Sequence, residues 1–156
     1  MPDTIFSQSE IEYLRSQRIA RIATASAATS EDGSKFVQPD VVPVGFDYDG
    51  GYFYVSGITI IRSKKYKNIL KNKKVALAVD DWKSDDSWGP RGIRIYGDAD
   101  VVTRQGGYMD QTGRSEHTYI RIRPNKKWSW GVDEPVFSDG KFNAKRAQAD
   151  VDESVP

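Results

Sequence analysis

The 156-residue sequence predicts a mainly β protein, a six- to seven-stranded antiparallel barrel with short flanking helices. Four Trp, eight Tyr and six Phe, together with many Val and Ile residues, favour strands over helices. Turn residues separate six or seven strand-like segments, whereas only two short segments have the apolar spacing of a helix. A small antiparallel barrel accommodates this pattern, and the chain is long enough for one domain with a real core.

The first helix is predicted to begin directly after Ser7, whose hydroxyl can cap it with Glu10 as the capping-box partner. Ile11 and Leu14 supply the apolar stripe of this helix. Residues 18–27 follow, and their small and β-branched side chains predict the first strand.

Residues 36–49 alternate well enough for a second strand, although Pro39 and Pro43 cannot donate hydrogen bonds to a neighbouring strand. Part of this strand is therefore expected at a sheet edge or a bulge. The Asp-Gly-Gly sequence at residues 49–51 predicts a tight hairpin into a third strand, which begins at Tyr52.

The second helix is predicted over residues 63–71, because Tyr66, Ile69 and Leu70 recur at the spacing of one helix face. A helix N-terminus has a partial positive charge and favours acids. The first turn of this helix nevertheless contains two lysines and no acid, which needs a physical reason.

The remaining strands are predicted at residues 75–81, 93–102 and 117–124, separated by polar loops, and residues 125–131 can extend the last of them. Gly97 indicates a bend or bulge in the middle strand. From residue 133 onward the chain is polar with few apolar anchors. We therefore expect a barrel domain at residues 1–132 and a largely mobile tail at residues 133–156.

The totals exclude several function classes. Lys and Arg number 23 against 22 Asp and Glu, so no large net charge attracts the chain to nucleic acid or to an anionic membrane. The absence of Cys excludes disulfides, thiolate metal sites and cysteine nucleophiles, and favours a cytoplasmic location. No apolar run is long enough to span a membrane, and the first ten residues lack the pattern of a signal peptide.

One histidine and one acidic cluster remain as candidates for metal or acid–base chemistry. His117 opens a predicted strand without a neighbouring acid, which is more typical of a surface or packing residue than of catalysis. Asp80, Asp81, Asp85 and Asp86 match no calcium-loop spacing and are more typical of a solvated turn. No metal site is therefore expected.

The cationic start of the second helix predicts an anion site. Ser63 can cap the helix and leave the first backbone N–H groups pointing outward, while Arg62, Lys64 and Lys65 add positive charge. These cations oppose the helix dipole but would attract a phosphate. The alternative is an ordinary solvated face, because further lysines continue to the C-terminal end, where cations are favourable. These lysines are Lys67, Lys71, Lys73 and Lys74.

Two further features fit a flat ring. Val42 and Val44 flank Pro43, which cannot donate to a neighbouring strand, so the backbone there can face a planar heterocycle. An ordinary edge strand is the alternative explanation of this proline. Trp128 and Trp130 lie on the same side of an extended segment, where they can cover a cofactor or pack in a core or dimer interface.

Five segments, in their order and spacing, resemble the pyridoxamine 5′-phosphate oxidase-like split-barrel flavoproteins. They are RIARIATAS, QPDVVPVGFDYDGGYFYVSG, RSKKYKNILKNKKVALAVDD, PRGIRIYGDADVV and YIRIRPNKKWSWG. The similarity spans residues 6–131 and is greatest to the branch of small reductases that use the deazaflavin coenzyme F420. The resemblance implies a split barrel like that of FMN-binding proteins, assembled as a homodimer with two cofactor sites in grooves between the barrels.

The resemblance also implies a phosphate group, a ring group and a closing group of cofactor-binding residues. They are Ser63, Lys64, Lys65 and Asn68 for the phosphate, with Arg62 at the anionic tail; Val42, Pro43 and Val44 along the ring, with Ser56, Gly57 and Ile58 beside it; and Trp130 and Gly131 closing the pocket from the same chain or from the partner subunit. This chain has Lys where many relatives have Arg and lacks the usual Pro near Lys73. Because Lys makes a point contact instead of a bidentate one, FMN stays an alternative to F420.

The leading hypothesis is an oxidoreductase that binds reduced F420 and transfers a hydride to a small conjugated or planar acceptor, the cofactor supplying the chemistry. The absence of a recognisable set of catalytic acids and bases agrees with it. An FMN-dependent oxidase or reductase on the same barrel is the first alternative. A non-catalytic binder of a flavin or another planar ligand is the second, and a nucleic-acid module using the basic helix is the least favoured.

Overall fold

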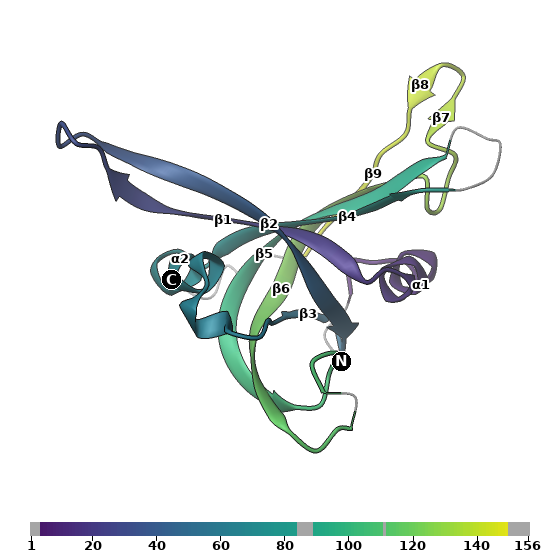
Figure 1. Ribbon diagram of the computed structural model, residues 1–156. Coiled ribbons are helices and arrows are strands. Elements are labelled where there is room, and N and C mark those ends of the chain that lie inside the picture. Colours follow the sequence, from purple (N-terminus) through teal and green to yellow (C-terminus); the bar gives the residue numbers. More distant parts are fainter. Residues whose placement is uncertain (1–3, 84–88, 111, 150–156) are drawn as a thin grey trace.

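The computed structural model describes residues 4–83, 89–110 and 112–149 (Figure 1). Within these residues, seven strands form one antiparallel sheet in the order β3-β2-β1-β4-β5-β6-β9, and pairing of β3 with β6 closes six of them into a barrel. The elements in chain order are α1 (Gln8–Ser16), β1 (Ile19–Thr29), β2 (Lys35–Asp49), β3 (Tyr52–Val55), η1 (Ile60–Arg62), α2 (Lys64–Lys71), β4 (Lys74–Trp82), β5 (Pro90–Gln105), β6 (Glu116–Trp130), β7 (Phe137–Ser138), β8 (Lys141–Phe142) and β9 (Lys145–Gln148).

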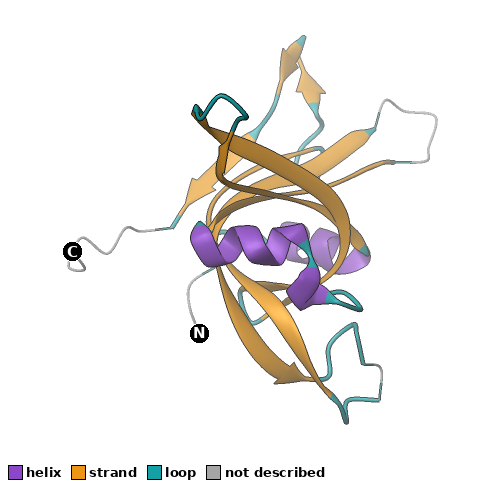
Figure 2. Cartoon of the chain, turned by 60° about the vertical axis from the view of Figure 1, so that its left-hand side comes forward, coloured by secondary structure: helices purple, strands orange, loops and turns teal. Residues whose placement is uncertain are grey.

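This architecture confirms the predicted mainly β fold, and Figure 2 shows the two helices against a chain that is otherwise mostly strand. Alternate side chains of the barrel strands form one core. Its most deeply buried members include Ile22, Phe53, Val55, Leu77, Val79, Ile93, Ile95, Ile120 and Ile122. Phe6 packs edge-on against Tyr48 and Phe53, with ring centroids 5.5 and 5.9 Å apart, and so joins the N-terminal segment to this core.

Both predicted helices are confirmed. α1 begins after Ser7 with a complete capping box to Glu10, and α2 begins after Ser63. α1 and α2 lie on opposite sides of the strands (Figure 1). No helix in the described part of the chain combines the length and the apolar character needed to cross a membrane.

The strand β2 lies partly at a sheet edge, as its prolines predict. Residues 35–45 pair with β1, and residues 46–49 pair with β3 on the other edge. The edge of residues 35–45 that faces away from β1 therefore has no strand partner in the described structure. The hairpin between β2 and β3 turns at Gly50 and Gly51, which both have positive φ, as a two-residue turn of this kind requires.

Strands β5 and β6 form the longest pairing of the barrel. The register shifts between Tyr96 and Gly97, which confirms the predicted irregularity. A side chain at Gly97 would come within 2.6 Å of the Arg123 carbonyl oxygen, so only glycine allows this approach. Residues 125–130 do extend the last barrel strand.

The segment from residue 133 onward differs from the predicted mobile tail over its described part. β7 pairs with β8, and β9 pairs with β6 from Lys126 to Ser129. Val136 is buried, and Lys145 forms an ion pair with Asp133. Strand pairing uses backbone hydrogen bonds, so a polar segment can complete a sheet edge without an apolar pattern to announce it. The domain boundary at residue 132 stays a prediction, and residues 150–156 lie outside the described residues.

Candidate functional site

The N-terminal end of α2 has the predicted cap and the predicted excess of cations. The Ser63 Oγ accepts a hydrogen bond from the Tyr66 N–H, 3.3 Å away, and the Ser63 hydroxyl donates to the Ile60 carbonyl. The first turn, which is described in full, contains no acid. Lys64 in this turn and Arg62 just before the Ser63 cap are exposed. Backbone donors and side-chain cations therefore meet at one helix end, as an anion site requires.

Lys65 differs from its exposed neighbours because it is half-buried. Burial lowers the pKa of the Lys65 ammonium, while the nearby Asp40 carboxylate on β2 opposes this change. A bound anion would act in the same direction as Asp40 and favour the charged form. The charged form of Lys65 would therefore be stabilised by a bound anion.

Asn68 is buried, and its side chain is bonded within the protein. Its Nδ2 donates to the Thr24 Oγ1, 2.9 Å away, and its Oδ1 accepts from the Ser26 Oγ, 2.8 Å away. Both partners lie on β1, so Asn68 attaches α2 to the barrel and orients the cationic helix end. The phosphate-binding role implied for Asn68 stays a prediction.

The free edge of β2 lies along one side of the candidate site. Pairing of β2 with β3 ends at Phe46 and Val55, after which the chain runs through η1 to α2, and α2 packs on β1. The edge of β2 at residues 41–45 has no strand partner among the described residues. The stretch from residue 56 to residue 63 thus begins where the free edge of β2 begins, and it ends at the cationic start of α2.

The three residues predicted to line the ring share this free edge, but their side chains do not point one way. Val44 is buried in the core and Val42 packs against it, whereas Pro43 is exposed on the opposite face. A planar ligand here would meet the strand through its backbone edge more than through these three side chains.

Ser56, Gly57 and Ile58 form the turn after β3. Ser56 is buried, its hydroxyl donates to the Thr118 carbonyl, and its backbone N–H and C=O both bond with the Tyr108 hydroxyl. A side chain at Gly57 would meet open space, and Ile58 is 97% exposed. The turn is anchored at Ser56 and open at the next two residues.

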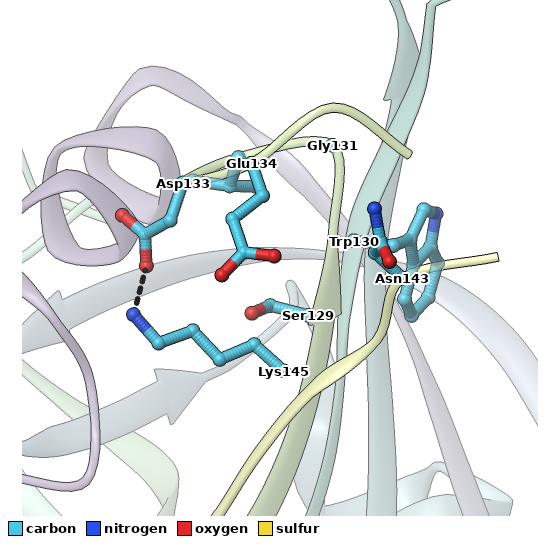
Figure 3. A pocket seen from close by; sticks show the side chains of 8 residues that line it. Ser129, Trp130, Gly131, Asp133, Glu134, Asn143 and Lys145 are labelled. Carbon is cyan, nitrogen blue, oxygen red and sulfur yellow. Dashed lines mark hydrogen bonds and ion pairs between the residues drawn. The ribbon is translucent and has the colours of Figure 1, made fainter. Parts of the chain in front are cut away.

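Trp130 and Gly131 lie elsewhere in the chain. Gly131 has φ +67°, and a side chain there would come within 2.4 Å of the Pro90 carbonyl oxygen. Together with Asp133 and Lys145 they border a cavity of about 10 Å³, enough for one water at most (Figure 3). Ser7 at the start of α1 donates to Asp133, which places this segment beside α1. Within one chain the structure does not bring the two closing residues to the start of α2.

A larger groove of about 720 Å³ opens between the C-terminal end of α1, the end of β2 and the loop after β5. Its lining residues are Leu14, Arg15, Gln17, Arg18, Phe46, Asp47, Tyr48, Asp49, Arg104 and Tyr108. The Arg104 guanidinium stacks 3.9 Å from the centre of the Tyr54 ring. Sequence analysis did not predict this groove, because its residues come from three separate stretches of the chain, residues 14–18, 46–49 and 104–108.

Tyr108 is the residue of this region that sequence analysis missed. It lies in the segment that the sequence predicts only as a polar loop, and an aromatic residue directly after two glycines is the one signal that could have revealed it. Burial raises the pKa of Tyr108 to about 12, so its hydroxyl stays protonated and can donate to Ser56.

The acidic cluster is divided by the structure. The Asp81 carboxylate accepts two hydrogen bonds from the Arg91 guanidinium, at 2.7 and 2.9 Å, and one from the Tyr13 hydroxyl. These contacts lower the pKa of Asp81, the Arg91 hydrogen bonds most of all. Asp80 pairs with Arg21, and the other two acids of the cluster, Asp85 and Asp86, lie outside the described residues. In the described chain no three His, Asp or Glu side chains gather as metal ligands.

Comparison with known proteins agrees with this geometry. A family model described as pyridoxamine 5′-phosphate oxidase matches residues 8–131. A 5a,11a-dehydrotetracycline/5a,11a-dehydrooxytetracycline reductase of Streptomyces rimosus is 33% identical over 130 residues, which cover 82% of this chain and 84% of that protein.

The solved structures that share the fold include two that are named for a ligand that they bind. One is an FAD-binding protein from Mesorhizobium loti, with 18% identity and a TM-score of 0.52 over 80% of this chain and 93% of that one. The other is a heme-binding protein from Mycobacterium smegmatis, with 13% identity and a TM-score of 0.56 over 92% of this chain and 59% of that one. The family match and the identity to the reductase both span most of the sequence, and the chain belongs to the pyridoxamine 5′-phosphate oxidase family.

Proposed function

We propose that this protein is an oxidoreductase that binds coenzyme F420 and transfers a hydride to a small conjugated or planar acceptor. The observation that supports it most is the start of α2, where a capped helix end with three cations and no acid in its first turn lies near the free edge of β2. The 33% identical reductase supports the reaction class.

The donor set fits an anionic flavin-type cofactor. The α2 N–H groups with Lys64 and Lys65 would hold a phosphate, and Arg62 would meet the anionic tail. The edge of β2 at residues 42–44 and the turn at residues 56–58 would border the ring. When bound, the deazaflavin supplies the hydride; the protein binds, orients and excludes water.

The proposal includes a homodimer in which Trp130 and Gly131 of the partner subunit close the pocket. It is supported by the bond from Ser7 to Asp133, which holds the segment directly after these two residues at the start of α1, while α1 and α2 lie on opposite sides of the strands (Figure 1). Exposed apolar side chains around the candidate site also support a covering partner. They include Val41 (67% exposed), Ile58 (97%), Ile61 (58%) and Leu70 (64%).

Two alternatives remain on the same site. An FMN-dependent oxidase or reductase would use the same helix end and strand edge. A non-catalytic binder of a planar ligand is favoured by the solved structures of the same fold, since they are named for binding FAD and heme.

Equilibrium binding of F420 and FMN, measured side by side by quenching of tryptophan fluorescence, tests the proposal. We expect micromolar or tighter binding of F420 and weaker binding of FMN. The reverse preference would replace the proposal with the FMN enzyme, and absence of binding to either would refute both. Analytical ultracentrifugation at the same protein concentrations tests the dimer. A protein that is saturated with ligand and still sediments as a monomer would contradict it.

Lys65→Gln provides a sharper test of the phosphate position, because it removes a cation without placing a new charge beside Asp40. We expect F420 to bind at least ten-fold more weakly, since one charge-assisted contact contributes about 1.5–3 kcal/mol. Lys71→Gln, in the last turn of the same helix, is the matched control and should bind normally. Equal affinities of the two variants would contradict the assignment.

A further inference from the structure

The pairing of β2 with β3 ends abruptly beside the candidate site, where the free edge of β2 begins. The last pair is Phe46 with Val55, and continued antiparallel pairing would place Ser56 opposite Gly45. Ser56 instead bonds through its backbone N–H and C=O to the Tyr108 hydroxyl. One phenol thus takes both backbone groups that would otherwise be available to extend the pairing.

The Tyr108 ring lies against Gly45 at the same point. A side chain at Gly45 would come within 2.9 Å of the Tyr108 Cε2, so the ring occupies the space directly over β2. The Tyr108 N–H donates to the Asp47 carboxylate, 2.7 Å away, which fixes the residue on the next outward position of the strand. Tyr108 therefore contacts β2 on both sides of Phe46 and the start of the turn after β3.

We propose that Tyr108 is a positioning residue that ends the β2–β3 pairing and fixes the turn at residues 56–58, so that the edge of β2 at residues 41–45 stays free for a planar ring. This inference rests on the proposed function, because it concerns the same ring site. It adds a residue from the loop after β5, which neither the helix end nor the strand edge includes. Tyr108 also lines the 720 Å³ groove.

Tyr119, on β6, contacts the same loop and offers a matched control. Its hydroxyl donates to the Gly106 carbonyl, 2.8 Å away, and accepts from the Met109 N–H, 3.3 Å away. It therefore holds the loop on both sides of Tyr108, but none of its described hydrogen bonds reaches Ser56 or Gly45. Tyr119→Phe loosens the loop as Tyr108→Phe does, without removing the bonds to Ser56.

The first experiment compares the affinities of the wild type, Tyr108→Phe and Tyr119→Phe for F420 and for FMN. We expect Tyr108→Phe to bind its preferred cofactor about five- to ten-fold more weakly, because two hydrogen bonds to the turn are lost. Tyr119→Phe should match the wild type in affinity even if it unfolds at a lower temperature. At saturation, the visible absorption spectrum of the bound cofactor should change in Tyr108→Phe alone. Equal losses in both variants, or normal binding and spectrum in Tyr108→Phe, would overturn the inference.

A second measurement needs no ligand and separates this inference from the proposed function. Hydrogen exchange of the ligand-free proteins, followed by mass spectrometry, should show faster exchange at residues 56–58 in Tyr108→Phe than in the wild type. Tyr119→Phe should accelerate exchange in residues 106–109 only. If the wild type binds neither cofactor, the proposed function fails, while exchange still tests whether Tyr108 fixes the turn. Unchanged exchange at residues 56–58 in Tyr108→Phe would refute its positioning role.

Discussion

The two α-helices have the same kind of N-terminal cap, but the side chains of their first turns have opposite charges. α1 follows Ser7 and α2 follows Ser63, and both serines are extended residues whose Oγ accepts a bond from the N–H three positions later. In α1 that third position is Glu10, which bonds back to the Ser7 N–H. In α2 the first turn contains lysines and no acid.

The two helices therefore differ in whether a negative charge of the protein balances the positive end of the helix dipole. In α1 the partner is internal, because Glu10 supplies negative charge and is itself neutralised by Lys127 at 2.7 Å. In α2 the side chains add positive charge to a positive helix end, so no side chain of its first turn balances the dipole. The start of the first helix is thus satisfied within the protein, whereas the start of the second has the charge that the proposed phosphate binding would use.

The largest expected effect comes from breaking the internal partner of α1. Glu10 and Lys127 are both buried, so Glu10→Ala would leave the lysine without its counter-ion in the core. We expect the free energy of unfolding to fall by about 3–5 kcal/mol. Urea unfolding followed by circular dichroism measures this loss.

The double variant Glu10→Leu/Lys127→Met is the control for this prediction, because it removes both charges and keeps apolar volume. Its stability should recover most of the loss, since replacing a buried pair by apolar residues is often neutral or stabilising. A double variant as unstable as Glu10→Ala would indicate that the hydrogen bond to Ser7, and not the buried charge, determines the effect.

The sequence predicts both helices, their caps and the barrel strands, because these depend on local patterns. The capping box at Ser7, the Gly50–Gly51 turn and the irregularity at Gly97 each require only neighbouring residues to be recognised. The partners of these elements are not local. Lys127 has no sequence neighbour that reveals its burial against Glu10, which lies 117 positions earlier.

The candidate site divides in the same way. The cationic start of α2 is local and was predictable from Arg62 to Lys65. Asn68 of α2 bonds to Thr24 of β1, and Tyr108 bonds to Ser56 after β3. Both contacts depend on which elements meet in space. A strand such as β9 is hidden for a third reason, since its attachment to β6 uses backbone groups that every residue has.

The attachments of the two helices to the barrel give a second, smaller difference. α1 is attached through Asp81, which accepts bonds from Tyr13 and Gln17, whereas α2 is attached through the neutral Asn68. The folded protein lowers the pKa of Asp81, so its charged form stabilises the fold above the unfolded pKa of about 4. This stabilisation is lost as the pH falls through the lower folded pKa.

Asp81→Asn should therefore lower the free energy of unfolding by about 1–3 kcal/mol at pH 7, and progressively less as the pH falls below 4. Denaturant unfolding at several pH values measures the difference from the wild type. Asp80→Asn is the control, because its pair with Arg21 is about half exposed and should contribute about 1 kcal/mol or less. A loss in Asp81→Asn that stays constant down to acid pH would contradict an ionic attachment.

The smallest expected change tests the difference between the two helices most directly, because it gives the first turn of α2 an acid like that of α1. Lys64→Glu places an acid in the first turn beside the Ser63 cap, where it interacts favourably with the helix dipole. We expect the ligand-free protein to gain about 0.3–1 kcal/mol of stability at low ionic strength, and F420 binding to weaken. Lys71→Glu in the last turn should do the opposite, with lower stability and unchanged binding. Thermal unfolding and fluorescence titration of both variants measure the two effects. If Lys64→Glu stabilised the protein and left binding intact, the cations of this turn would be an ordinary solvated face, because nothing bound would depend on them.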